Sequence, residues 1–312
     1  MKDLHILPKV KDSWSYLYIE HSKIDQDAKS ITVHDTKGAI QVPCAVLSLL
    51  MLGPGTSITH AAVKTLADNG CMLMWCGEEG VRVYAVGLGE TRSSRNLLRQ
   101  VRLHSDPDLR LQVVRRMYEY RFPGEDLSGL RLEQLRGREG VRVRESYSRA
   151  SGETGVEWKG RGYKSGSWRS ADPINRALSA GNSCLYGLCH AAIVASGYSP
   201  ALGFIHTGKA LSFVYDIADL YKANIVIPAA FRLAADGNGG VETRMRHVLR
   251  DKFFESRLLE KIVPDLAFLM SGTASPEEQE DDFDADDALP SGLWDPETGI
   301  VAGGVNHSDP EN

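Results

Sequence analysis

The sequence predicts an α+β protein with an N-terminal β-rich domain, a C-terminal all-α domain and an acidic tail. In residues 1–88, apolar and polar side chains alternate, which is the period of a β-strand. In residues 89–274, apolar side chains recur every three or four positions, which is the period of an amphipathic helix. Residues 275–312 are acidic and contain Pro, Gly and Ser, so we expect this tail to be disordered when free.

The β-rich domain is expected to contain strands paired into a sheet, with one helix packed on it. Two of the candidate strands alternate in polarity between polar turns, and two are continuous apolar runs typical of deeper burial. The segment SITHAAVKTLADNG predicts the helix, which should end at Asn69-Gly70. The strand candidates, in order, are WSYLYIEHSKID, KSITVHDTKGAIQVP, AVLSLLML, CMLMWC and GVRVYAVG.

Helical periodicity continues through most of the second domain. Gly137 and Gly140 fall inside one such segment and indicate either a close backbone approach or a break. Asp172-Pro173 is typical of an N-cap followed by the first helical residue. Pro228 should bend or split the segment after Ser212. The helical candidates begin with RNLLRQVRLH, DLRLQVVRRMYEYRF, LRLEQLRGREGVRVRESYSRA, INRALSAGNSCLYGLCHAAIVASG, FVYDIADLYKANIVIPAAFRLAADG and VETRMRHVLRDKFFESRLLEKIVPDLAFLM.

The net charge of −5 hides a basic body. Of the 41 Asp and Glu residues, twelve lie in residues 275–312, which hold no Lys or Arg. The rest of the chain therefore carries 36 basic and 29 acidic residues, a net charge of +7. Residues 91–170 alone hold 18 basic and 10 acidic side chains. A basic body favours a polyanionic partner, nucleic acid first, although an arginine-rich surface can also be simply solvated.

Composition argues against membrane and secreted classes. No apolar run reaches the roughly 18–20 residues that span a bilayer, and the N-terminus lacks the features of a signal peptide. We therefore expect a cytoplasmic protein that does not bind membranes. Five cysteines without a CxxC pair fit reduced core thiols better than disulfides or a zinc knuckle.

Two aspartates in an apolar helical segment form the main chemical signal. On a helix, Asp216 and Asp219 share a face, with Cβ atoms roughly 5–6 Å apart. Burying a carboxylate without a partner is energetically unfavourable, so either a cation is bound there or this face of the helix is exposed to solvent. His206, just before the helix, is suited to reach the same point, which favours Mg²⁺ or Mn²⁺ over Ca²⁺. Glu139 lies among arginines and is either a further ligand or an ion-pair partner.

Four sequence blocks, in order and at compatible spacing, resemble a known family. They are GEEGVRVYAVG, LRGREGVRVRESY, NSCLYG and GFIHTGKALSFVYDIADLYK. These blocks resemble the CRISPR adaptation integrase, the first CRISPR-associated protein, of the type I-E subtype. The resemblance covers about Trp14 to Gly272.

The resemblance implies an enzyme that joins DNA. Members form homodimers, and two such dimers flank a dimer of the second CRISPR-associated protein. The complex captures double-stranded DNA with 3′ single-stranded ends, the prespacer. Its two 3′-hydroxyls attack the CRISPR repeat by transesterification, with Mg²⁺ or Mn²⁺ as cofactor. A host DNA-bending factor is a potential further partner.

The resemblance also assigns the residues of the catalytic site. Glu139, His206 and Asp219 match the metal ligands of the family. Asp216 lies beside them and is implied to matter for activity or DNA contact. Tyr186 matches a tyrosine that orients or protonates a leaving oxygen, and core packing is its alternative role.

Other residues are implied to contact DNA. Arg82 matches a basic residue linked to activity, and Lys209 and Tyr215 match residues that read the protospacer-adjacent motif. Tyr163 and Trp168, in a glycine-rich loop, are weaker candidates for DNA contact.

The chain departs from the family pattern at the predicted DNA surface. His21 takes the place of an aromatic wedge at the duplex end, and imidazole offers less stacking surface than tyrosine. Ser57 replaces a basic residue, while Lys64 keeps the charge at the next basic place. The acidic tail, which contains Trp294, is expected to dock on the partner protein or near the motif-reading pocket.

Two other functions compatible with these residues remain open. A structure-selective, metal-dependent DNA endonuclease would use the same groups with water in place of a 3′-hydroxyl. A non-catalytic DNA-binding scaffold would use its acids only to pair with arginines.

Overall fold

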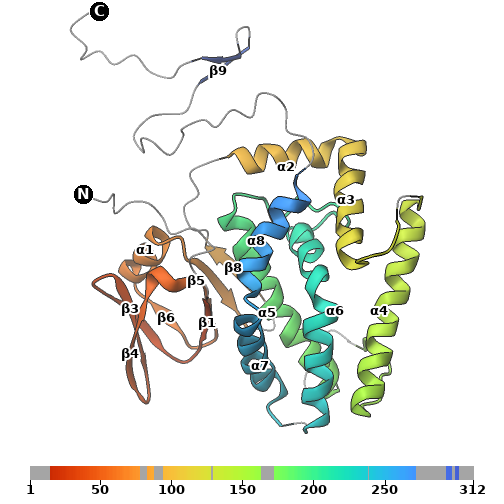
Figure 1. Cartoon of the computed structure of the whole chain (residues 1–312). Helices are drawn as coiled ribbons and strands as arrows, with labels where there is room; N and C mark the ends of the chain where they lie inside the picture. The colour runs from red at the N-terminus through yellow and green to blue at the C-terminus, as the bar shows by residue number, and fades with distance from the viewer. Residues whose placement is uncertain are drawn as a thin grey trace, which may run out of the picture. The chain divides into compact units, whose positions relative to one another are not determined.

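The computed structural model describes residues 15–77, 83–87, 94–127, 129–162, 172–237, 239–271, 293–296 and 299–301. Residues Met1–Ser271 form one compact unit, and Gly272–Asn312 form a second one. Within the first unit, strands precede helices, as predicted (Figure 1). The α+β fold class is therefore confirmed, whereas the domain boundaries predicted at residues 88 and 274 stay predictions.

In the described residues of the N-terminal half, the strands form two four-stranded sheets where the sequence predicted one. One has the order β4-β3-β2-β6, antiparallel except for the parallel pair β2 and β6. The other has the order β1-β5-β7-β8, with β1, β5 and β7 parallel and β8 antiparallel. The strands are β1 Ser15–Ile19, β2 Lys23–Asp27, β3 Ser30–Asp35, β4 Gly38–Pro43, β5 Leu47–Leu52, β6 Ser57–Ile58, β7 Met72–Cys76 and β8 Val83–Gly87.

The helix α1, His60–Asp68, confirms the local signals of its segment. Thr59 caps it by accepting a hydrogen bond from the Ala62 N–H, and the chain turns at Asn69-Gly70. Gly70 has a φ of +69°, which favours glycine because it lacks a Cβ atom. The helix contacts β2 and β3 of one sheet and β7 of the other, so its buried side, which includes Leu66, packs against both sheets.

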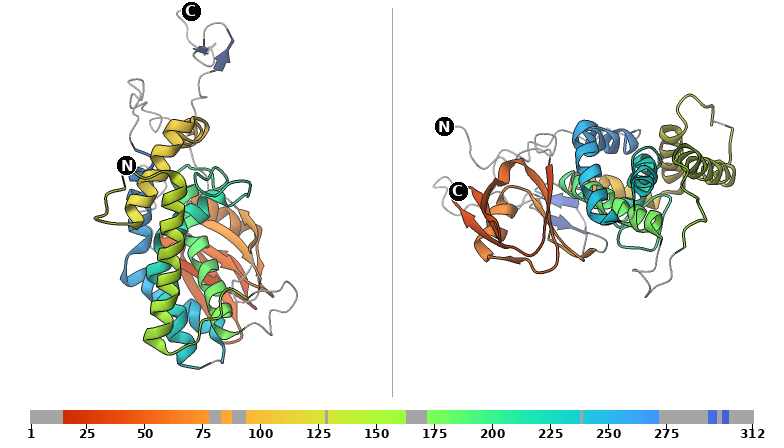
Figure 2. Two further views of the ribbon diagram at one scale, coloured as in Figure 1. Left: turned by 90° about the vertical axis from the view of Figure 1, so that its right-hand side faces the viewer. Right: turned by 90° about the horizontal axis from the view of Figure 1, so that it is seen from below.

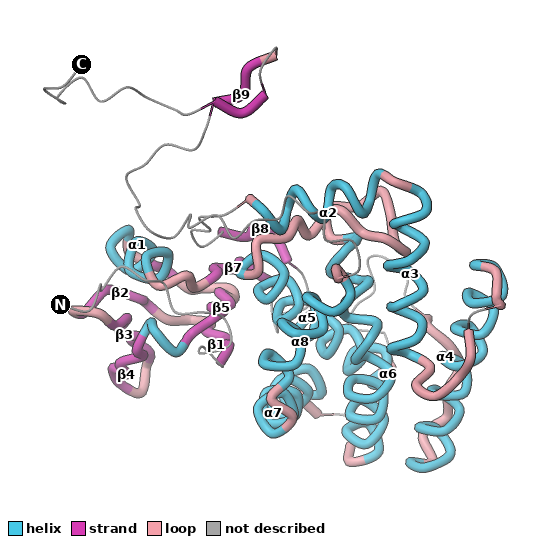
Figure 3. The backbone as a smooth tube through the Cα atoms, turned by 45° about the horizontal axis from the view of Figure 1, so that its top comes forward, coloured by secondary structure: helices cyan, strands magenta, loops and turns pink. Residues whose placement is uncertain are grey.

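Seven helices in the described residues of the first unit form the helical half (Figures 1 and 3). They are α2 Arg95–Ser105, α3 Pro107–Arg121, α4 Leu132–Thr154, α5 Pro173–Ala195, α6 Ser212–Ala235, α7 Val241–Glu255 and α8 Leu258–Leu269. α6 contacts α5, α4 and α7, so its apolar side chains lie at the centre of the helical core. α5 packs on the second sheet, where Gly187 lies against Leu49 and Met74 (Figure 2 shows the two halves from two sides).

The predicted helical breaks differ from the observed ones. α4 runs through Gly137 and Gly140 without a break, and a Cβ atom at either would meet nothing within 4 Å. α6 runs through Pro228 as one helix, because contacts on several sides hold it. The last segment, in contrast, divides at Arg257, whose φ of 48° is incompatible with a continuing right-handed helix. The predicted cap at Asp172 is confirmed, since its side chain accepts from the Asn175 N–H at 2.7 Å.

Among the described residues, one helix has the length and mean hydropathy of a membrane span. It is Pro173–Val194 in α5, where Asn175, Arg176 and Asn182 interrupt the apolar residues, so the expectation that no continuous apolar run spans a bilayer is not contradicted. Its window is 89% buried within the protein, as in the core helix of a water-soluble domain. All five cysteines are free and buried, as predicted from their spacing.

The second unit contains a short hairpin, in which β9 Leu293–Asp295 pairs antiparallel with β10 Gly299–Val301. Trp294 lies opposite Ile300 in this pairing. We expected order here only on a partner, yet the hairpin is present within the chain itself. Residues 272–292, 297–298 and 302–312 of the tail lie outside the described residues.

Candidate active site

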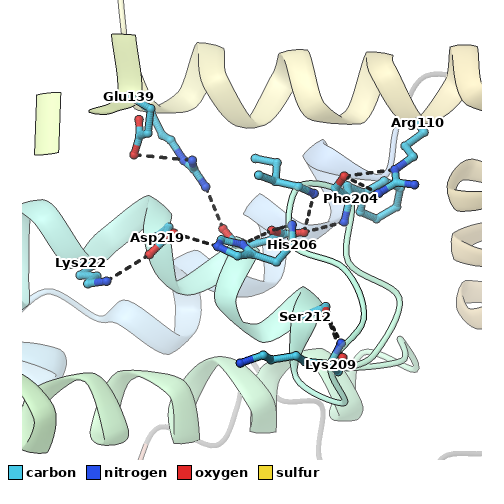
Figure 4. A network of polar contacts seen from close by, with 11 residues as sticks. Arg110, Glu139, Phe204, His206, Lys209, Ser212, Asp219 and Lys222 are labelled. Atoms are coloured by element: carbon cyan, nitrogen blue, oxygen red, sulfur yellow. Dashed lines mark hydrogen bonds and ion pairs between the residues drawn. The ribbon is translucent and has the colours of Figure 1, made fainter. Parts of the chain in front are cut away.

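A fully buried carboxylate organises the loop before α6. The Asp216 side chain accepts hydrogen bonds from the backbone N–H groups of Phe204 at 2.6 Å, Ile205 at 3.1 Å and His206 at 2.9 Å (Figure 4). The His206 ring donates a fourth bond from Nδ1 at 2.7 Å. Four donors replace the water that the carboxylate loses on burial. Neither a cation nor a wet helix face is needed to explain Asp216.

The loop reaches Asp216 because the backbone passes very close at Gly203. A Cβ atom there would lie 2.4 Å from the His206 carbonyl oxygen and 2.7 Å from the Ser212 carbonyl carbon. Ser212 closes the other end of the loop, where its hydroxyl accepts from the Lys209 N–H and donates to the Lys209 carbonyl. Arg110 on α3 adds two hydrogen bonds to the Phe204 carbonyl oxygen.

Asp216 sets the protonation pattern of His206. Because a carboxylate can only accept, Nδ1 carries the proton, and Nε2 of the neutral ring keeps its lone pair. Nε2 lies 3.9 Å from the Asp219 carboxylate (Figure 4). The hydrogen bond to Asp216 raises the pKa of His206 above 6.5, although partial burial acts in the opposite direction. Asp216 is therefore a positioning residue, and its burial excludes the direct DNA contact considered from the sequence.

Asp219 lies one helical turn after Asp216, as the sequence spacing predicted, but the two carboxylates have different environments. The Asp219 side chain is 26% exposed and lies 3.6 Å from the Lys222 ammonium group. The expectation that one cation bridges Asp216 and Asp219 is wrong, because Asp216 is enclosed by the loop backbone. Asp219 thus remains available to an incoming ligand beside His206.

Glu139 approaches this pair from α4 but lies against arginines. Arg142, three residues later on the same helix, donates to its carboxylate at 3.2 and 3.3 Å. The buried Arg121, from the end of α3, lies 3.6 Å from it. Within the described part of the chain, no three His, Cys, Asp or Glu side chains meet closely enough to form a metal site. Carboxylates repel one another, and here Glu139 lies beside arginines while Asp219 lies beside Lys222.

The donor set nevertheless fits a divalent cation. A carboxylate that holds the far nitrogen of a histidine is the usual arrangement behind a metal-binding imidazole. Here Asp216 has that place, and His206 Nε2 and Asp219 are partly exposed beside each other. One nitrogen and carboxylate oxygens suit Mg²⁺ or Mn²⁺. Glu139 would be the third ligand once its carboxylate moves from Arg121 and Arg142 to the metal ion.

Two tyrosines border the histidine. The rings of Tyr186 and Tyr215 meet edge to face at 5.1 Å, and Tyr215 meets His206 in the same way at 6.0 Å. Burial, followed by the negative charge of Asp219, raises the pKa of Tyr186 above its ordinary value. Its hydroxyl is therefore neutral at physiological pH and can donate a hydrogen bond.

The predicted DNA contacts are divided among several places. Lys209 lies exposed on the His206 loop, and Lys64 lies exposed on α1 beside Asp68. His21 is exposed at a turn, with a φ of 49°. Arg82, Tyr163 and Trp168 lie outside the described residues.

The sequence did not single out three arginines at this site. Arg110 donates to the Phe204 carbonyl oxygen, Arg121 contacts both Asp216 and Glu139, and Arg142 pairs with Glu139, yet each stands in a segment crowded with other arginines. The sequence did hold a signal for Arg121. It follows Met117 and Tyr118 by four and three residues, so it lies on the apolar face of the predicted helix, where a buried arginine needs a partner.

Comparisons with known proteins agree with the resemblance to this family, while the type I-E subtype stays a prediction. A family model described as CRISPR associated protein Cas1 matches residues 16–123 and 128–249. The chain is 56% identical over 304 residues to CRISPR-associated endonuclease Cas1 2 of Thermus thermophilus, covering 97% of this chain and 93% of that protein. It is 45% identical over 257 residues to CRISPR-associated endonuclease Cas1 of Escherichia coli, covering 82% of this chain and 84% of that protein.

Solved structures show the same likeness. The crystal structure of a TtCas1–DNA complex has a TM-score of 0.82 at 53% identity, covering 94% of this chain and all of that one. A casposase bound to integration product has a TM-score of 0.64 at 16% identity, covering 87% of this chain and 97% of that one. The second comparison shows a shared fold alone.

We expect the imidazole of His206 to titrate above pH 6.5 in metal-free protein, because Asp216 stabilises its charged form. The folded state then binds this proton more tightly than the unfolded state does. The resulting stabilisation is fully present below pH 6.5 and is lost as the pH rises through the raised pKa. An NMR titration in EDTA, with His206→Gln to assign the resonance, measures this. A midpoint below 6.5 would contradict the assigned hydrogen bond.

Proposed function

The chain belongs to the Cas1 family of CRISPR-associated proteins, and from this premise we propose that it joins prespacer 3′-hydroxyl ends to a CRISPR repeat. The reaction is a transesterification, in which one phosphodiester bond forms as another breaks. The observation that supports it most is His206, held by Asp216 with Nε2 directed to Asp219. Such a pair beside a basic helix suits chemistry on a DNA phosphate.

His206, Asp219 and Glu139 would hold Mg²⁺ or Mn²⁺. Bound there, the ion supplies charge stabilisation at the scissile phosphate and helps to position the attacking oxygen. The chain's own groups do the rest. Asp216 fixes the His206 ring, and the neutral hydroxyl of Tyr186 donates a hydrogen bond to the leaving oxygen.

The surface of α4 would bind the DNA backbone. Its exposed arginines include Arg136, Arg144 and Arg149, and the same helix carries Glu139. Contacts to phosphates fix the position of DNA without reading its sequence. Lys209 and Tyr215, beside His206, would read the motif that adjoins the prespacer. Lys64, His21, Arg82 and Tyr163 remain proposed DNA contacts.

The finer assignments follow the sequence resemblance. We place the chain in the type I-E subtype, working in the cytoplasm as a homodimer. Two such dimers would be bridged by a dimer of the second CRISPR-associated protein. The 45% identity to the Escherichia coli protein is compatible with that arrangement.

A structure-selective endonuclease is the second candidate, favoured by the name endonuclease that the curated relatives carry. Water would then take the place of the 3′-hydroxyl at the same groups. The two functions differ in product, because joining leaves a covalent link between two DNA molecules and hydrolysis leaves only a nick.

Replacing His206 by Ala should lower joining at least about 100-fold, because the nitrogen that faces Asp219 is lost. DNA binding should stay within about threefold, because the arginines of α4 are unchanged. The assay combines a supercoiled plasmid bearing the repeat, a 3′-hydroxyl oligonucleotide, the partner protein and Mn²⁺. His247→Ala, an exposed histidine on α7, is the matched control.

Covalent oligonucleotide–plasmid products with wild type and His247→Ala support integration. Nicks without joined product support the endonuclease. Unchanged products with His206→Ala would refute the assigned site.

DNA affinity should fall steeply with salt, because bound phosphates release counterions. Replacing Arg144 and Arg149 together by Ala should reduce the slope of log K against log salt by about 1–2, at about 0.9 per phosphate contact. Arg244→Ala with Arg250→Ala removes the same charge from α7 and should leave the slope unchanged. Fluorescence anisotropy at several salt concentrations measures both. Equal slopes for the two double variants would remove α4 from the interface.

A further inference from the structure

A buried arginine lies between the candidate metal ligands. Arg121 is 2% exposed at its side chain, and its Nη2 donates to the Asp216 carbonyl oxygen at 3.2 Å. Its Nη1 lies 3.6 Å from Glu139 (Figure 4 shows Glu139 above His206 and Asp219). Its Nε is buried and has no hydrogen-bond partner. Arg121 thus connects the carboxylate of α4 with the helix that carries Asp216 and Asp219.

The charge of Arg121 depends on Glu139. A buried cation without an anion is strongly unfavourable, and water does not reach this guanidinium. Among the described residues, Glu139 is the carboxylate found within ion-pair distance of it. Arg142 also pairs with Glu139 but is 18% exposed, so it can turn toward solvent when the carboxylate moves. Arg121 has no such alternative.

We infer that Arg121 is a built-in competitor of the divalent cation at this site. Glu139 cannot fully serve the metal and Arg121 together, and the two cations also repel each other across a short distance. Arg121 therefore lowers the metal affinity of the site. This inference rests on the proposed function, because it assumes that Glu139, His206 and Asp219 are the ligands.

The competition has a consequence for the order of assembly. A DNA phosphate brings negative charge to the site and offsets the excess positive charge of metal and arginine. DNA and metal should therefore raise each other's affinity by the same factor. The site would bind its metal tightly only when the DNA substrate is present, which limits cleavage of unselected DNA.

The direct test is Mn²⁺ binding to the full-length chain, measured by the loss of the free-ion signal in electron paramagnetic resonance. Arg121→Met keeps much of the volume and removes the charge, so the Kd for Mn²⁺ should fall by roughly tenfold. Arg121→Lys keeps the charge and should stay near wild type. Arg138→Met is the control. It also removes one positive charge, but from an exposed ion pair with Glu125, so it should change the Kd less than twofold.

An unchanged or higher Kd in Arg121→Met would overturn the inference while leaving the metal site intact. Failure of the proposed metal site looks different, because Glu139→Gln would then titrate like wild type. In that case both the inference and the metal-dependent part of the proposed function fail.

Thermal melting in EDTA provides a test that does not require Arg121→Met to fold. Glu139→Gln removes the anion of a buried arginine, so its melting temperature should lie below that of wild type. Asp219→Asn, at a partly exposed carboxylate, should change it much less. A Glu139→Gln protein that melts at or above the wild-type temperature would contradict the role of Arg121.

Discussion

The hydrogen bonds of Asp216 are the constraint on which the candidate site depends. One carboxylate, without solvent exposure, fixes three consecutive backbone N–H groups and the His206 ring. The same contact selects the nitrogen of His206 that faces Asp219. A flexible loop would leave this imidazole free to rotate, whereas here its direction follows from the burial of α6. The core of the helical half and the chemistry of the site are thus joined at one side chain.

The balance of charge around Glu139 is a second organising feature. Two arginines share its carboxylate, one buried and one near the surface. Under the proposed function, the site has to remain stable before a divalent cation and DNA arrive. Arg121 and Arg142 neutralise the Glu139 carboxylate until then, and the proposed competition would make metal and DNA binding depend on each other.

Local features were readable from the sequence, and contacts between distant segments were not. The end of α1 and the start of α5 followed from residues directly beside them, Asn69-Gly70 and Asp172-Pro173. The partners of Asp216 come from a loop that returns through Gly203, and spacing along a helix cannot show such a path. The aspartate pair therefore predicted the candidate site described above, but the reason given, one cation between the two carboxylates, does not hold for Asp216. The resemblance supplied a set of residues to consider, but not the arginines that hold Glu139.

The most direct measurement is the anomalous diffraction of manganese in a crystal of this protein bound to DNA. We predict a peak coordinated by His206 Nε2, Asp219 and Glu139, with Asp216 still hydrogen-bonded to His206 Nδ1 and Glu139 withdrawn from Arg121. A peak coordinated by Asp216, or no manganese beside His206, would contradict the positioning role from which the site was built.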